Sequence, residues 1–117
     1  MSRPVVYGIR NCDTVRKARA WFEAQGVEVL FHDFAKSGVP ADRLPAWLAA
    51  AGWQRLLNRQ GSTWRKLDPA TQATASDAAG AAVLMAAQAS VIKRPVVDWP
   101  DGRVSVGFDA AEFARHL

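Results

Sequence analysis

The first third of the chain alternates between strand and helix patterns. Residues 4–9 combine β-branched and aromatic side chains, which predicts a strand. From Thr14 to Gln25 apolar residues recur at intervals of three and four, which predicts a helix that stops at Gly26. Residues 27–34 alternate in polarity and predict a second strand. We therefore expect two parallel strands joined by a right-handed helical crossover.

The middle of the chain shows helical patterns only. An apolar face that ends at Gly52 predicts one helix, and residues 53–57 predict a further short turn. Asp68, which precedes a proline, predicts another helix start, because a carboxylate caps free amides and proline fits the first turn. Asp77 predicts the cap of an alanine-rich helix running to about Ala89. Since this helix is apolar nearly all round, we expect it to be largely buried.

The last part of the chain returns to strands. Residues 96–99 and 103–106 flank a Pro-Asp-Gly turn and predict a hairpin. Asp109 and Glu112 form a capping-box pattern, which predicts a final helix to Leu117. The summed order is βαβ, a helical block, then ββα, which is typical of an α/β protein.

Length and composition favour one soluble domain. The chain has 117 residues, half of them hydrophobic, and a net charge of +4. No apolar run is long enough to span a membrane, and the N-terminal residues lack a signal-peptide core, so we expect a cytoplasmic protein without a membrane partner. No basic stripe interleaves with aromatic residues, so we expect no direct binding of nucleic acid. A single cysteine fits a reducing compartment.

That cysteine, Cys12, is the strongest candidate for chemistry. It lies in a polar turn at the carboxyl end of the first strand, where α/β folds place ligands. Free amides and the positive end of the helix dipole favour an anion there, which lowers the pKa of a thiol. Its neighbours Asn11, Asp13 and Thr14 are polar cap formers rather than core partners. The alternative, a small buried structural cysteine, fits this position less well.

The segment Lys93-Arg94-Pro95 is the second candidate. A cis peptide bond before Pro95 would turn the two cations toward Cys12, whereas a trans proline at a strand edge would leave them solvated. The residues leave both alternatives open.

Two other features carry less chemistry. His32 and His116 have no partners at metal-ligand spacing, so we expect no metal site. The polar loop 58–67 contains a glycine and ends in apolar residues, so it is a candidate pocket lining.

Three motifs resemble the YffB-like branch of the arsenate reductase (ArsC)/Spx family. They are YGIRNCDTVRKA at 7–18, LLN at 56–58 with TWRKL at 63–67, and IKRP at 92–95. The match covers essentially the whole chain in the family's order. The resemblance implies a thioredoxin/glutaredoxin-like mixed four-stranded sheet within a single domain, 1–117. Residues 1–34 and 91–117 would form its core, and about 40–90 a helical insertion.

The resemblance also assigns roles. Cys12 matches the nucleophilic cysteine, Thr14 and Arg16 the helix-opening residues, and Arg94 the arginine that binds the oxyanion before a cis-proline. Arsenate reductases of this family have two more arginines. Asn58 stands at the first position, with Arg59 displaced by one, and the second falls in the Gly107-Phe108 region. These departures argue against arsenate as the substrate.

A glutathione-dependent thiol-disulfide reductase with one nucleophilic cysteine is the function that we expect. Glutathione would be a co-substrate and no cofactor would be bound. Because Val15 stands three residues after Cys12, a CxxC switch cannot form and an external thiol must resolve the intermediate. The alternatives are an arsenate reductase coupled to glutathione and glutaredoxin, and an Spx-like regulator that binds RNA polymerase. The expected binding residues are Asn11, Asp13, Thr14, Arg16, Asn58, Arg59, Lys93 and Pro95, with Cys12 and Arg94 catalytic.

Overall fold

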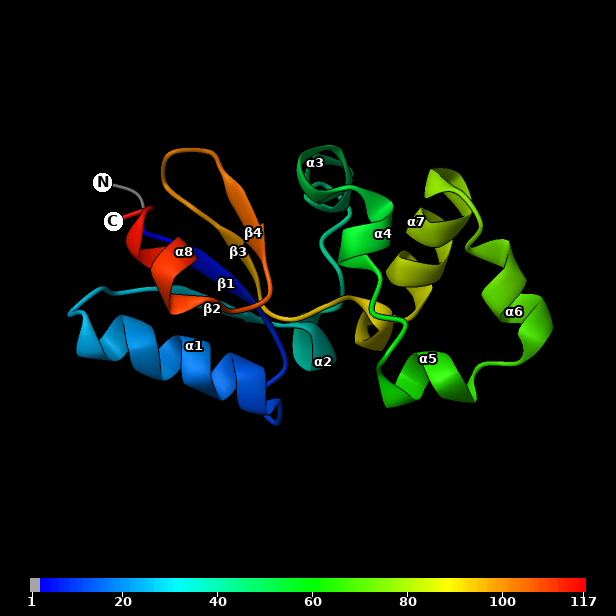
Figure 1. Ribbon diagram of the computed structural model, residues 1–117, viewed down its shortest axis with the longest axis horizontal. Helices are drawn as coiled ribbons and strands as arrows, with labels where there is room; N and C mark the ends of the chain where they lie inside the picture. The colour runs from blue at the N-terminus through cyan, green and yellow to red at the C-terminus, as the bar shows by residue number, and fades with distance from the viewer. Residues whose placement is uncertain (1–2) are drawn as a thin grey trace. The chain divides into compact units, whose positions relative to one another are not determined.

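The computed structural model describes residues 3–117, so Met1 and Ser2, at the start of the predicted core, lie outside the described residues. The chain forms two compact units (Figure 1): the first comprises the chain up to Ser37 and from Arg94 onward, and the second is Gly38–Lys93. The first unit contains β1 (Val5–Gly8), α1 (Asp13–Ala24), β2 (Leu30–Asp33), α2 (Phe34–Ser37), β3 (Val96–Asp98), β4 (Val104–Val106) and α8 (Ala110–Ala114). The second contains α3 (Leu44–Ala51), α4 (Trp53–Leu56), α5 (Ser62–Lys66), α6 (Pro69–Thr74), α7 (Ala78–Ala87) and the 3₁₀ turn η1 (Ala89–Val91).

The first unit is built on a mixed sheet of order β2-β1-β3-β4. β1 pairs with β2 in parallel, as predicted, and with β3 antiparallel, while β3 and β4 form the predicted hairpin. Val6 of β1 pairs with Val97 of β3, and both side chains face a core shared with Ala18 and Phe22 of α1 and Phe113 of α8. The two helices therefore cover the same face of the sheet. This mixed four-stranded α/β architecture is the fold class that the sequence predicted.

Local contacts explain the shape of this core. Buried residues of α1 fall at Val15, Ala18 and Phe22, a spacing that gathers them on one side of the helix. The indole Nε1 of Trp99 donates a buried hydrogen bond of 2.9 Å to Oγ of Ser105 and ties β3 to β4. The polar atoms of both buried side chains are thus satisfied, which avoids a desolvation cost.

The second unit consists of short helices, of which α6 and α7 have aspartate caps. The carboxylate of Asp68 accepts a hydrogen bond from the Thr71 amide, and that of Asp77 from the Gly80 amide, so both predicted caps form. A Cβ atom on Gly80 would lie 1.7 Å from the Thr74 carbonyl oxygen, so only glycine permits this close approach of α6 and α7.

Four predictions about the extent of elements need correction. β2 begins at Leu30, three residues after the predicted start, and Phe34 already belongs to α2. The predicted polar loop contains a helix, α5, and α8 ends at Ala114 rather than at Leu117.

The prediction that the alanine-rich helix is largely buried is wrong. α7 ends at Ala87, and Ala81, Leu84 and Met85 are its buried residues. Val83 is 72% exposed, because the neighbouring helices of the second unit cover one side of α7 only. A uniformly apolar helix of small residues can therefore be a surface helix.

Candidate functional site

Cys12 occupies the N-cap position of α1. Its backbone is extended, with φ −108° and ψ 123°, and its carbonyl oxygen accepts the first helical hydrogen bond, 2.9 Å from the Arg16 amide. No side chain makes a hydrogen bond that caps this helix. The half-buried thiol therefore stands where a cap oxygen usually lies, facing amides that have no helical partner.

The sheet brings Arg94 to this thiol. Cys12 follows β1, and Arg94 precedes β3, which runs antiparallel to β1 with Tyr7 opposite Val96. The two strand ends, and the residues attached to them, therefore meet at one edge of the sheet. The bond between Arg94 and Pro95 is cis, as one of the two alternatives left open by the sequence required, and Arg94 contacts the thiol, whereas Lys93 is exposed. The Pro95 carbonyl accepts a hydrogen bond from the Gly107 amide, which anchors this segment beside β4.

The surroundings lower the pKa of Cys12 below the ordinary value of a thiol. Partial burial is the largest single influence and raises the pKa, because it disfavours the charged form. The Val15 amide and the Arg94 guanidinium act in the opposite direction, with smaller help from the Thr14 amide, and together they outweigh burial. Arg94 contributes both a hydrogen bond to sulfur and its positive charge.

Polar neighbours of Cys12 have a different role from the expected one. Asn11, Asp13 and Thr14 do not cap α1 with their side chains, because Cys12 itself takes the cap position. The guanidinium of Arg16 instead reaches Oδ1 of Asp13 at 2.9 Å and Oδ1 of Asn11 at 3.3 Å. This exposed cluster closes the turn around Cys12 and keeps a cation one helical turn beyond the thiol.

Gly8, which sequence analysis did not single out, determines how closely α1 approaches the sheet. A Cβ atom at this position would lie 2.7 Å from Cγ2 of Val15, a distance at which one of the two must move. The absence of a side chain at Gly8 lets the first turn of α1 pack directly on the end of β1. A glycine near the end of a strand was the available sequence signal.

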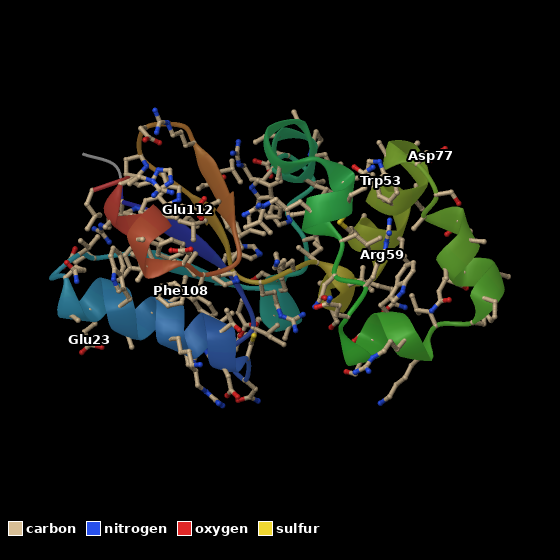
Figure 2. All side chains as sticks on the ribbon, viewed as in Figure 1. Glu23, Trp53, Arg59, Asp77, Phe108 and Glu112 are labelled. Carbon is tan, nitrogen blue, oxygen red and sulfur yellow. The ribbon has the colours of Figure 1, made fainter. Side chains whose placement is uncertain are left out.

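The remaining expected binding residues belong to the second unit. Asn58 accepts a hydrogen bond from the Gln60 amide, and its own amide donates to Val91. The guanidinium of Arg59 lies 5.3 Å from the ring centroid of Trp53, on the short helix α4 (Figure 2). Lys93 is exposed, and its amide donates 2.8 Å to the Leu56 carbonyl.

Both histidines lie in aromatic surroundings. His32 packs on Tyr7 and Phe34, and His116 stacks on Trp99 with ring centroids 4.4 Å apart. Within residues 3–117 no three His, Cys, Asp or Glu side chains gather as a metal site would require. No helix in the same residues is long and apolar enough to cross a membrane.

Fold and site together define a thioredoxin-like α/β protein with a single thiol at the start of its first helix. The ArsC family model matches residues 7–116, which is nearly the whole chain. The chain belongs to the ArsC family.

Relatives agree with this assignment. An uncharacterized protein from Haemophilus influenzae is 35% identical over 108 residues, covering 92% of this chain and 93% of the relative. The solved structure of a YffB protein is 46% identical with a TM-score of 0.92, covering 97% of this chain and 98% of that one. An arsenate reductase (ArsC) related protein from Brucella melitensis is 43% identical with a TM-score of 0.74, covering 98% and 94% of the two chains. The protein is therefore related to arsenate reductases.

Proposed function

We propose that this protein reduces glutathione mixed disulfides with Cys12 as its only nucleophile. The observation that carries the proposal is the position of the thiol at the cap of α1 beside Arg94. There the helix amides and the Arg94 guanidinium lower the pKa of the thiol. A thiolate attacks disulfides, whereas a thiol does not, so a lowered pKa raises the reactive fraction at neutral pH.

The reaction proceeds in two exchanges. The Cys12 thiolate attacks the glutathione sulfur of R–S–S–glutathione, forming a Cys12–glutathione disulfide and releasing the thiolate of R, which takes a proton from water. A second glutathione thiolate then attacks this disulfide, restoring the Cys12 thiolate and producing oxidised glutathione. In sum, one free glutathione thiol and the mixed disulfide give the thiol of R and oxidised glutathione, so the free glutathione is oxidised as the sulfur of R is reduced. Because the chain contains one cysteine, the second thiol must come from outside.

Arg94 has a second role in this proposal. After the first exchange the Cys12 sulfur is neutral, and the positive charge of the guanidinium beside it would attract a glutathione carboxylate. Pro95 shapes the backbone next to the sulfur. Lys93 and Arg59, which the sequence also assigned to the carboxylates, are exposed residues of the second unit.

The test is reduction of the mixed disulfide of glutathione and 2-mercaptoethanol by the protein and by its Cys12→Ser variant. We expect turnover with the first and at least a hundredfold loss with the second, since a hydroxyl is not ionised at neutral pH. Rapid alkylation and mass spectrometry should find one glutathione on Cys12 during turnover. Equal rates for the two proteins would overturn the proposal, and so would turnover of arsenate without reduction of the disulfide.

A further inference from the structure

A groove of about 420 Å³ is lined by α1 and the segment that follows it in the first unit. Five residues of α1 line it, together with Val27 and Val29 of the segment that leads into β2. The α1 residues are Arg16, Arg19, Ala20, Phe22 and Glu23. Figure 2 shows Glu23 near the far end of the helix from Cys12.

The groove is aligned with the thiol. Positions 16, 19 and 23 follow the spacing of three and four residues that places side chains on one side of a helix, and Cys12 is the N-cap residue four positions before Arg16. Arg16 belongs to both places, because it lines the groove while its guanidinium contacts Asn11 and Asp13 on either side of Cys12. A polypeptide whose mixed disulfide with glutathione lies at the Cys12 sulfur could therefore run along α1 into the groove.

Arg19 is a prepared binding group for a carboxylate. Its guanidinium carbon lies 4.2 Å from the ring centroid of Phe31, a stacking contact that orients the planar group. Among the residues that the structure describes, no carboxylate forms an ion pair with it. The N–H edge of the guanidinium thus remains available for two parallel hydrogen bonds to an acid.

We propose that this groove binds the polypeptide part of the substrate, so that the mixed disulfides reduced by this protein are those of protein cysteines with a nearby acidic residue. This inference rests on the proposed function. In the first exchange the polypeptide is the group that leaves, and the groove holds it in position while glutathione remains on Cys12 next to Arg94.

Helix geometry gives the spacing of the acidic residue. Seven residues separate Cys12 from Arg19, or about 10 Å along the helix axis, which an extended peptide covers in about three residues. Glu23 lies about 6 Å further on, so an acidic residue two positions beyond the first should be disfavoured. Between these charges, Ala20, Val27 and Val29 present an apolar surface for an apolar side chain.

The test uses glutathionylated peptides with glutamate three residues before or after the cysteine, and matched peptides with glutamine there. We expect the protein to prefer the glutamate peptide about fivefold in kcat/KM in at least one of the two orientations, through KM. Arg19→Gln should abolish this preference. Lys17→Gln is the matched control, because Lys17 is an exposed cation of α1 that does not line the groove. Ala20→Trp should block the groove and weaken both peptides without a change of charge.

Two further measurements separate this inference from the proposed function. Fluorescence anisotropy with a serine-for-cysteine peptide measures binding without any reaction, and the mixed disulfide of glutathione and 2-mercaptoethanol measures the reaction without a peptide. If the glutamate peptide binds through Arg19 but is not reduced, the groove stands and the reductase proposal fails. If the small disulfide is reduced and Arg19→Gln and Lys17→Gln show the same preference between the glutamate and glutamine peptides, the groove inference is overturned. A loss of activity toward the small disulfide in Arg19→Gln would also overturn it, because the groove would then hold glutathione.

Discussion

The first-turn amides of α1 and α7 face different side chains at the N-cap position. Both helices follow a residue with an extended backbone, and both have first-turn amides without helical partners. At α7 the carboxylate of Asp77 accepts a hydrogen bond of 2.8 Å from the Gly80 amide. At α1 the residue in the same position is Cys12, and no side chain caps the helix.

An aspartate cap stabilises its helix, whereas a cysteine cap lets the helix amides favour ionisation of the thiol. A carboxylate cap stabilises a helix because it is already ionised when it accepts its hydrogen bonds. A cysteine at that position leaves the same amides to stabilise an anion that forms only when the thiol ionises, and Arg94 adds a positive charge. The four experiments below test this contrast, from the largest expected effect to the smallest.

Replacing Cys12 with aspartate should give α1 a carboxylate cap like the one that Asp77 gives α7. We expect disulfide reduction to fall by at least a hundredfold, since the nucleophile is gone. The free energy of unfolding should rise by about 1 kcal/mol relative to Cys12→Ala, because the carboxylate caps α1 and lies beside Arg94. Urea denaturation of the two variants measures the gain. An aspartate variant no more stable than the alanine variant would contradict the idea that the amides at this site are available to an anion.

Removing the cation should raise the pKa of the thiol. In Arg94→Met the guanidinium no longer contacts the sulfur, so the pKa of Cys12 should move up toward the ordinary thiol value. Iodoacetamide alkylation followed against pH should show a several-fold slower reaction at pH 7. Arg103→Met is the control, because Arg103 lies in the hairpin turn and pairs with Asp101. Identical profiles for both variants would assign the lowered pKa to the helix amides alone.

Removing the carboxylate cap should weaken the second helix start. In Asp77→Ala the Gly80 amide loses its acceptor, and we expect a loss of about 1 kcal/mol in the free energy of unfolding. Asp77→Asn should retain most of that stability, since an amide oxygen also caps. Asp42→Ala, at an exposed turn position, serves as a control for the loss of one negative charge. If Asp42→Ala costs as much as Asp77→Ala, the cap is not the cause.

The thiol itself should make stability depend weakly on pH. Because the pKa of Cys12 is lower in the folded state, the folded chain binds fewer protons than the unfolded chain between the two pKa values. The resulting stabilisation is fully present above the unfolded pKa and is lost as pH falls through the folded pKa. The difference in unfolding free energy between the protein and Cys12→Ser, followed by urea denaturation, should therefore grow toward alkaline pH. A difference that shrinks with rising pH would have the wrong sign.

Sequence patterns predicted the architecture well because its signals are local. The apolar spacing of α1, the aspartates at positions 68, 77 and 109, and the Pro-Asp-Gly turn each define an element through its own residues. The pairing of the strands then joins these elements into one sheet and brings the Gly107 amide to the Pro95 carbonyl. The burial of α7 was not predictable in the same way, because Val83 and Leu84 look alike in sequence and differ only in whether a neighbouring helix covers them.

The site was partly predictable for a related reason. The helix amides that help to lower the pKa of Cys12 could be expected from its position in the chain, whereas the contact with Arg94 depends on the pairing of β1 with β3, which are far apart in the sequence. The roles of Asn11 and Asp13 were misjudged, because three polar residues around a helix start all resemble caps and only geometry shows which position is the cap. The contact of Arg19 with Phe31 joins α1 to β2, and the sequence pattern of neither element predicts it.

Gly8 has a consequence for how the protein tolerates mutation. It carries no reactive atom, yet a single methyl group there would lie 2.7 Å from Val15 and push the first turn of α1 away from β1. The amide that acts on the sulfur belongs to that same Val15. In a saturation screen scored by thiol reactivity, Gly8 should therefore be among the least replaceable positions, and Gly8→Ala should regain function when combined with Val15→Ala.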